Sequence, residues 1–66
     1  MKFEELYNNC YVEMKDGKPL FAYDRLADAR KGVLYDMMAE ATFDDMEHHV
    51  YEVKYLKDGH YIDIIE

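Results

Sequence analysis

The sequence predicts an α+β domain, in which an antiparallel sheet of two hairpins packs on one long helix. Asp-Gly occurs twice, at Asp16–Gly17 and Asp58–Gly59, each time between two runs with alternating apolar residues. This dipeptide favours the type I′ turn of a two-residue hairpin loop, whose central residues both need positive φ. Between the hairpins, residues 24–42 lack proline and carry apolar residues at helical spacing. The expected order is therefore ββαββ in two layers.

The first elements follow from local patterns. Residues 2–9, KFEELYNN, have apolar residues at three- and four-residue intervals, which predicts a short N-terminal helix ending near the two asparagines. Residues 10–23 form the first hairpin. Because Pro19 cannot donate a hydrogen bond, its strand is expected at an edge. A two-residue loop gives the register Met14 with Pro19, Val12 with Phe21 and Cys10 with Tyr23.

The long helix is predicted over residues 24–42. Its expected sheet-facing stripe consists of Leu26, Val33, Leu34, Met37 and Ala41. Asp36 and Glu40 lie along one flank of this stripe. Gly32 lowers helix propensity, which suggests that helix and sheet approach closely there.

The second hairpin is predicted within residues 48–66. Counting outward from its turn gives an apolar face and a face with an opposite-charge pair. The apolar pairs are Tyr55 with Ile62 and Val53 with Ile64, and the other face pairs Lys54 with Asp63 and Leu56 with Tyr61.

Length and composition predict a single domain, residues 1–66, with a small core. A chain of this size buries only ~60% of its unfolded surface. Seven Tyr and three Phe supply dense aromatic packing, and a dimer or a bound partner would add stability. Cys10 is the only cysteine, and residues 1–9 contain no apolar run of signal-peptide length. We therefore expect a cytoplasmic protein with no membrane partner.

The net charge of −7 is confined to the second half of the chain. Residues 1–35 hold six acids and six bases, whereas residues 36–66 hold nine acids and two bases. From Asp36 to Val53 there is no Lys or Arg. This acidic tract disfavours direct binding of nucleic acid and favours a basic protein surface.

The stretch TFDDMEHHVYEV, residues 42–53, raises the question of a metal site. In a helix, Asp44 with His48 or Asp45 with His49 would share a face. In a strand, the two histidines point to opposite faces and cannot bind one ion. We interpret the stretch as a polar strand start and expect neither a metal nor a cofactor.

Catalytic patterns are weak in this sequence. It contains no serine, and its glycines are isolated at positions 17, 32 and 59, which leaves no phosphate-binding loop. A Cys10–histidine nucleophile pair is conceivable, but Cys10 on the Val12 face is better explained as a small core residue. We expect the protein not to be an enzyme.

Methionines and tyrosines offer a second kind of surface. A Met-rich groove can bind peptide helices, although filling gaps in the core is the more common role. The register and the helical wheel place Tyr11, Tyr35 and Tyr61 on the surface, and Tyr23, Tyr51 and Tyr55 in the core.

The acidic tract is the candidate partner-binding site. Carboxylates four residues apart on a helix are ~6 Å apart along its axis, and a nucleic-acid strand carries a charge every ~3.4 Å. Such a surface could occupy a Lys/Arg groove. A solvated face is the alternative. The candidate residues are Asp36, Glu40, Asp44, Asp45, Glu47 and Glu52.

The pattern DGKPLFAYDRLADARKGVL, a hairpin followed at once by a helix, resembles that of small orphan proteins of phages and mobile elements. Some small acidic members are anti-CRISPR proteins, several of which block DNA access with an acidic surface. The resemblance covers size, charge and element order. It implies a non-enzymatic inhibitor that binds a basic, nucleic-acid-binding surface of a host defence complex. The alternatives are a homodimeric structural or assembly protein and an antitoxin-like inhibitor of a basic protein.

Overall fold

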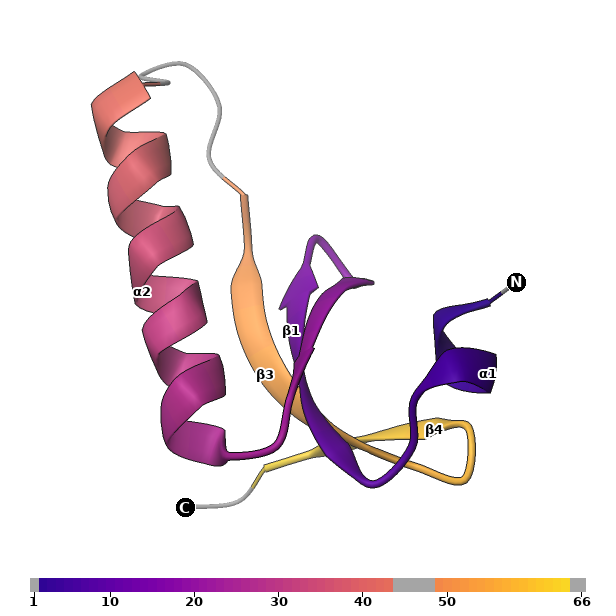
Figure 1. Cartoon of the computed structure of the whole chain (residues 1–66). Helices are drawn as coiled ribbons and strands as arrows, with labels where there is room; N and C mark the ends of the chain where they lie inside the picture. Colours follow the sequence, from indigo (N-terminus) through magenta and orange to yellow (C-terminus); the bar gives the residue numbers. More distant parts are fainter. Residues whose placement is uncertain (1, 44–48, 65–66) are drawn as a thin grey trace.

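The computed structural model describes residues 2–43 and 49–64, and it has the predicted fold class (Figure 1). A four-stranded antiparallel sheet has the order β2-β1-β3-β4, so the two hairpins meet through β1 and β3. The elements are α1 (Phe3–Leu6), β1 (Cys10–Lys15), β2 (Lys18–Tyr23), α2 (Leu26–Phe43), β3 (Tyr51–Lys57) and β4 (His60–Asp63).

Both hairpin turns have the predicted backbone geometry. The φ angles are 52° and 78° at Asp16 and Gly17, and 52° and 79° at Asp58 and Gly59. Two successive residues with positive φ are the requirement of a type I′ turn, and its twist matches that of the flanking strands.

The register predicted for the second hairpin is confirmed in β3 and β4. Tyr55 pairs with Ile62 and Leu56 with Tyr61. Lys54 pairs with Asp63, and its Nζ lies 3.3 Å from the carboxylate Oδ1.

The register predicted for the first hairpin is wrong beyond its first pairs. Met14 faces Pro19 as expected, but Val12 faces Ala22 and Tyr11 faces Tyr23. Leu20 is an extra residue between the partners of Met14 and Glu13, which makes a β-bulge directly after the proline. Pro19 has no N–H to donate, so the ladder is already weakened where the bulge forms.

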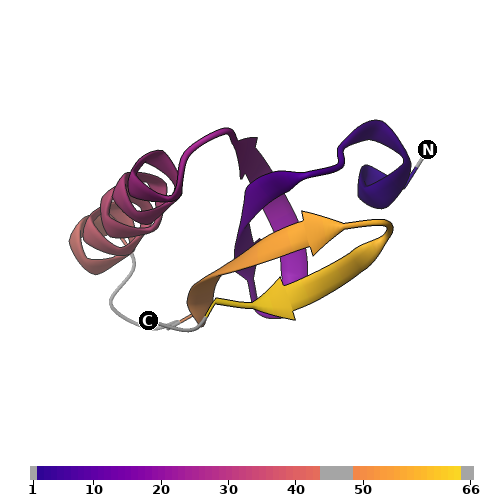
Figure 2. The same cartoon turned by 90° about the horizontal axis from the view of Figure 1, so that it is seen from below.

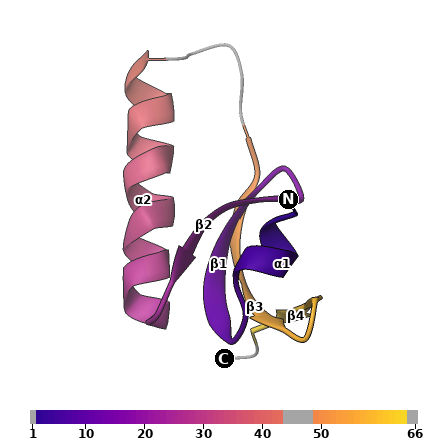
Figure 3. The same ribbon diagram turned by 45° about the vertical axis from the view of Figure 1, so that its right-hand side comes forward.

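The two helices lie on opposite sides of the sheet (Figures 1 and 3). The face away from α2 carries the apolar cluster Cys10, Val12, Met14 and Leu56, against which Phe3, Ala22 and Tyr61 pack. Although α1 is short, it therefore covers this apolar cluster. The other face of β1 carries Tyr11 and Glu13 toward α2.

Two of the three tyrosines expected on the surface are not there. Tyr61 packs against the apolar cluster, and its hydroxyl donates to Glu4 Oε1 at 2.7 Å. Tyr11 is half-buried, with its ring 5.1 Å from that of Tyr55. Tyr11 lies opposite Tyr55 in the β1–β3 pairing and Tyr61 lies against α1, and neither contact follows from the hairpins taken singly. Tyr35 is exposed, as predicted.

The orientation predicted for the long helix is wrong for three of its five stripe residues, whereas Leu26 and Val33 are half-buried. Leu34, Met37 and Ala41 face solvent, whereas Asp36 and Glu40 are half-buried on the side of the sheet. Apolar side chains occur all around α2, so its periodicity does not select one side. The observed rotation directs the small residues Ala29 and Gly32 toward the sheet.

Candidate interaction surface

The inner side of α2 approaches the sheet closely at Gly32. A Cβ atom at this position would lie 2.8 Å from Glu13 Oε1 and 2.8 Å from Tyr23 Cζ. Real Cβ atoms essentially never come so close to a neighbour, so a side chain at this position would require the Tyr23 and Glu13 side chains to shift. One turn earlier, Ala29 has no exposed surface. The close approach predicted from Gly32 is thus confirmed.

A carboxyl pair occupies the space beneath this contact. Glu13 on β1 is fully buried, and the Tyr23 hydroxyl donates to its Oε1 at 3.2 Å. Burial raises the pKa of Glu13 to about 7, and hydrogen bonding and like charge from Asp36 on α2 act in the same direction. The Asp36 carboxyl group is therefore engaged with the sheet.

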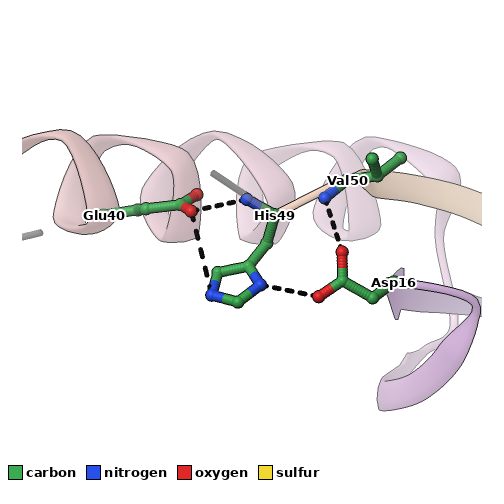
Figure 4. A network of polar contacts seen from close by, with 4 residues as sticks. All are labelled: Asp16, Glu40, His49 and Val50. Atoms are coloured by element: carbon green, nitrogen blue, oxygen red, sulfur yellow. Dashed lines mark hydrogen bonds and ion pairs between the residues drawn. The ribbon is translucent and has the colours of Figure 1, made fainter. Parts of the chain in front are cut away.

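Glu40 belongs to a second polar network, at the C-terminal part of α2 (Figure 4). Its Oε1 accepts a hydrogen bond from the His49 backbone N–H at 2.6 Å. His49 Nδ1 lies 2.6 Å from Asp16 Oδ2, and the Val50 N–H donates to Asp16 Oδ1 at 2.9 Å. The network connects the first turn, α2 and the start of β3.

The structure does not bring the predicted acidic residues onto one described surface. Asp36 and Glu40 face inward, as above. Glu52 is exposed, and Lys54 lies 3.8 Å from its carboxylate. The remaining candidates, Asp44, Asp45 and Glu47, lie outside the described residues.

What α2 presents to solvent is an apolar face. From Lys31 to Thr42, every residue of which is described, the exposed side chains carry one charge, that of Lys31. The exposed fractions are 60% for Leu34, 70% for Tyr35, 49% for Met37 and 65% for Met38. We call these four residues the outer face of α2. Apolar side chains exposed side by side mark interaction sites more often than isolated ones do.

Two shallow hollows border this outer face. One lies between α2 and β3 and is lined by Arg30, Val33, Leu34, Glu52 and Val53. The other is lined by Lys31, Leu34, Tyr35 and Met38 on α2 itself. Leu34 lines both hollows, so it lies at the centre of the surface that a partner would contact.

Sequence analysis missed the outer face because it assigned Leu34 and Met37 to the core. One signal was available. Leu34 and Met38 are separated by one helical turn, as Asp36 and Glu40 are. Either the Leu34–Met38 pair or the Asp36–Glu40 pair can face the sheet. The second pair does so because Asp36 interacts with Glu13 and Glu40 accepts a hydrogen bond from His49.

The described residues bear on the metal site and on the Cys10 nucleophile considered from the sequence. Within 2–43 and 49–64, no group of three or more His, Cys, Asp or Glu is arranged to hold a metal ion. His48, considered with Asp44, lies outside the described residues. Burial raises the pKa of the Cys10 thiol, which disfavours the nucleophilic thiolate. None of the described helices is long and apolar enough to span a membrane.

Comparison of the chain with protein-family models, with curated proteins and with solved structures found no match.

Proposed function

We propose that the protein is a non-enzymatic interaction module that binds a protein partner through the outer face of α2. The observation that carries this proposal is the exposure of Leu34, Tyr35, Met37 and Met38 on one helix, while the acidic residue between them, Asp36, faces the sheet. Burying large apolar side chains contributes ~25 cal/mol per Å², and Met adapts to irregular partner surfaces.

The test uses a matched pair of variants on α2. Met38→Glu places a carboxylate in the outer face, and Ala39→Glu makes the same charge change at the neighbouring exposed position. We expect proteins captured from a bacterial lysate, or self-association of the chain, to be lost with Met38→Glu and retained with Ala39→Glu. Equal behaviour of both variants and the wild type would contradict the proposal.

The charge distribution favours a second candidate function, an inhibitor of the anti-CRISPR type that occupies a basic nucleic-acid-binding surface. It is supported by the seven excess negative charges of residues 36–66 and by the exposure of Glu52. Binding of this kind is steered by charge and weakens as salt is added.

A charge-reversal set tests this candidate. It combines Asp44→Lys, Asp45→Lys and Glu52→Lys, and it omits Asp36 and Glu40 because they face the sheet. We expect the set to abolish capture of basic nucleic-acid-binding proteins at low salt. A control that reverses Glu5, Asp24 and Asp28 has the same net charge and should still bind. Capture that survives the first set and high salt would exclude charge mimicry.

A further inference from the structure

The outer face of α2 continues into a longer row with a regular spacing. Ala27, Lys31, Leu34, Met38 and Ala41 follow one another at intervals of four, three, four and three residues, and all five are exposed. This is the spacing of the contact positions in a pair of helices that cross at a shallow angle. We call these five residues the seam.

We propose that the seam pairs with the seam of a second copy of this chain in an antiparallel, two-fold symmetric dimer. This inference rests on the proposed function, because it names the occupant of the same outer face. A two-fold axis midway between Leu34 and Met38 places each Leu34 against the Met38 of the other copy. The same axis places Lys31 beside Ala41.

Charge favours the antiparallel orientation. In a parallel pair the two Lys31 ammonium groups would lie side by side and repel. In the antiparallel pair each Lys31 reaches the last turn of the other α2, which has no basic residue of its own. A helix C-terminus carries a partial negative charge from its unpaired carbonyl groups, so a cation is stabilised there. The small side chain of Ala41 leaves room for the lysine stem.

The rest of the described chain leaves the seam accessible. In all three ribbon views the sheet and α1 lie on one side of α2, and no described element covers its opposite side (Figures 1, 2 and 3). Asp36 and Glu40, the acids nearest the centre of the seam in sequence, face the sheet. Among the described residues, no exposed carboxylate therefore lies at the centre of the contact between the two copies, despite the net charge of −7.

The available area suits a small dimer. With ~200 Å² for a fully exposed large side chain, the four residues of the outer face expose roughly 500 Å² per copy. If the contact also covers Tyr35 and Met37 on the two flanks of the seam, two copies would bury about 1,000 Å², near the lower limit for a specific interface. A second copy would also supply apolar burial that the small core lacks, since only five apolar residues among those described are buried.

Sedimentation of the full chain over a wide concentration range tests the dimer. We expect a monomer–dimer equilibrium in the wild type and at least ~10-fold weaker association for Met38→Glu, because a carboxylate would replace the apolar contact with Leu34 of the other copy and would lose its hydration there. Ala39→Glu, off the seam, should change the dissociation constant less than ~3-fold. A wild type that stays monomeric at all concentrations, or a dimer that Met38→Glu leaves intact, would overturn the proposal.

Cross-linking tests the orientation. Chains carrying Lys31→Cys are mixed with chains carrying Ala41→Cys and are oxidised. Antiparallel pairing brings these two positions together, so the mixed disulfide should exceed both homodisulfides. A preference for homodisulfides would show a parallel pair and refute the arrangement. If the chain is monomeric but lysate capture still depends on Met38, only the dimer fails and the proposed interaction module stands.

Discussion

Glu13 is the residue whose titration should be most visible in the stability of the fold. Its pKa is raised from 4.5 to about 7, chiefly by burial. Between these values the unfolded chain releases the proton while the folded chain keeps it, so this group lowers the stability as pH rises through the window. Below pH 4.5 it makes no difference, and above pH 7 the full penalty of about 3 kcal/mol is present.

Glu13→Gln should remove this penalty while keeping the shape of the side chain and the hydrogen bond from Tyr23. We expect the variant to exceed the wild type by about 1–3 kcal/mol near pH 8 and to match it near pH 4.5. Urea unfolding at the two pH values measures the difference. Glu52→Gln, at an exposed site, is the control and should show no such gain.

The comparison must be made between variant and wild type, because other carboxylates act in the opposite sense. The Val50 backbone N–H lowers the pKa of Asp16, and the Tyr61 hydroxyl lowers that of Glu4. Both groups stabilise the fold above their unfolded pKa and lose this effect as pH falls through the folded value. A variant and a wild type with parallel pH profiles would contradict the role given to Glu13.

Gly32 gives a second prediction at the scale of one residue. Alanine normally stabilises a helix by ~1 kcal/mol relative to glycine. Here the added methyl group would contact Tyr23 and Glu13, so Gly32→Ala should instead destabilise by about 1–3 kcal/mol. Thermal unfolding measures the sign. In a double-mutant cycle, Tyr23→Phe should recover part of the loss; a stabilised Gly32→Ala would show that the helix does not approach the sheet as described.

At the scale of elements, the two hairpin turns provide a matched comparison. Asp16 and Asp58 have the same φ of 52° and both precede glycine, but only Asp16 accepts hydrogen bonds from His49 and Val50. Replacing either by alanine introduces the same backbone strain. Asp16→Ala should therefore lower the urea midpoint more than Asp58→Ala and should speed hydrogen exchange of the Val50 amide. Equal midpoints would mean that the network does not tie the first turn to β3.

The element-scale features differ in how far sequence could predict them. Type I′ turns depend on two residues each, so Asp16–Gly17 and Asp58–Gly59 identified both. The bulge at Leu20 lies in the β1–β2 ladder directly after Pro19, and counting outward from the turn assumes a regular ladder. The rotation of α2 depends on distant partners, Glu13 for Asp36 and His49 for Glu40. Periodicity reports the local preference and does not contain these long-range contacts.

For the whole molecule, the fold class was predictable and the exposed side of α2 was not. Predicting the ββαββ order requires only the number and type of the elements. The two hairpin signals and the one helical stretch provide both. To predict which residues form the surface, one must also know which side of each element faces outward. Asp36 and Glu40 were expected on the surface, whereas Leu34 and Met37 were expected in the core, and in the structure Leu34 and Met37 are exposed while Asp36 and Glu40 are half-buried. A carboxylate that shares a proton or accepts a backbone N–H can face inward in place of leucine.

The bulge after Pro19 has a consequence for how this molecule can associate. Exposed sheet edges invite strand addition by other chains. On β2, the proline removes a donor and Leu20 interrupts the ladder, while the opposite edge strand, β4, has only four residues. Neither margin is a good template for a further strand. Growth into open-ended aggregates by strand addition is thereby discouraged at both edges of the sheet.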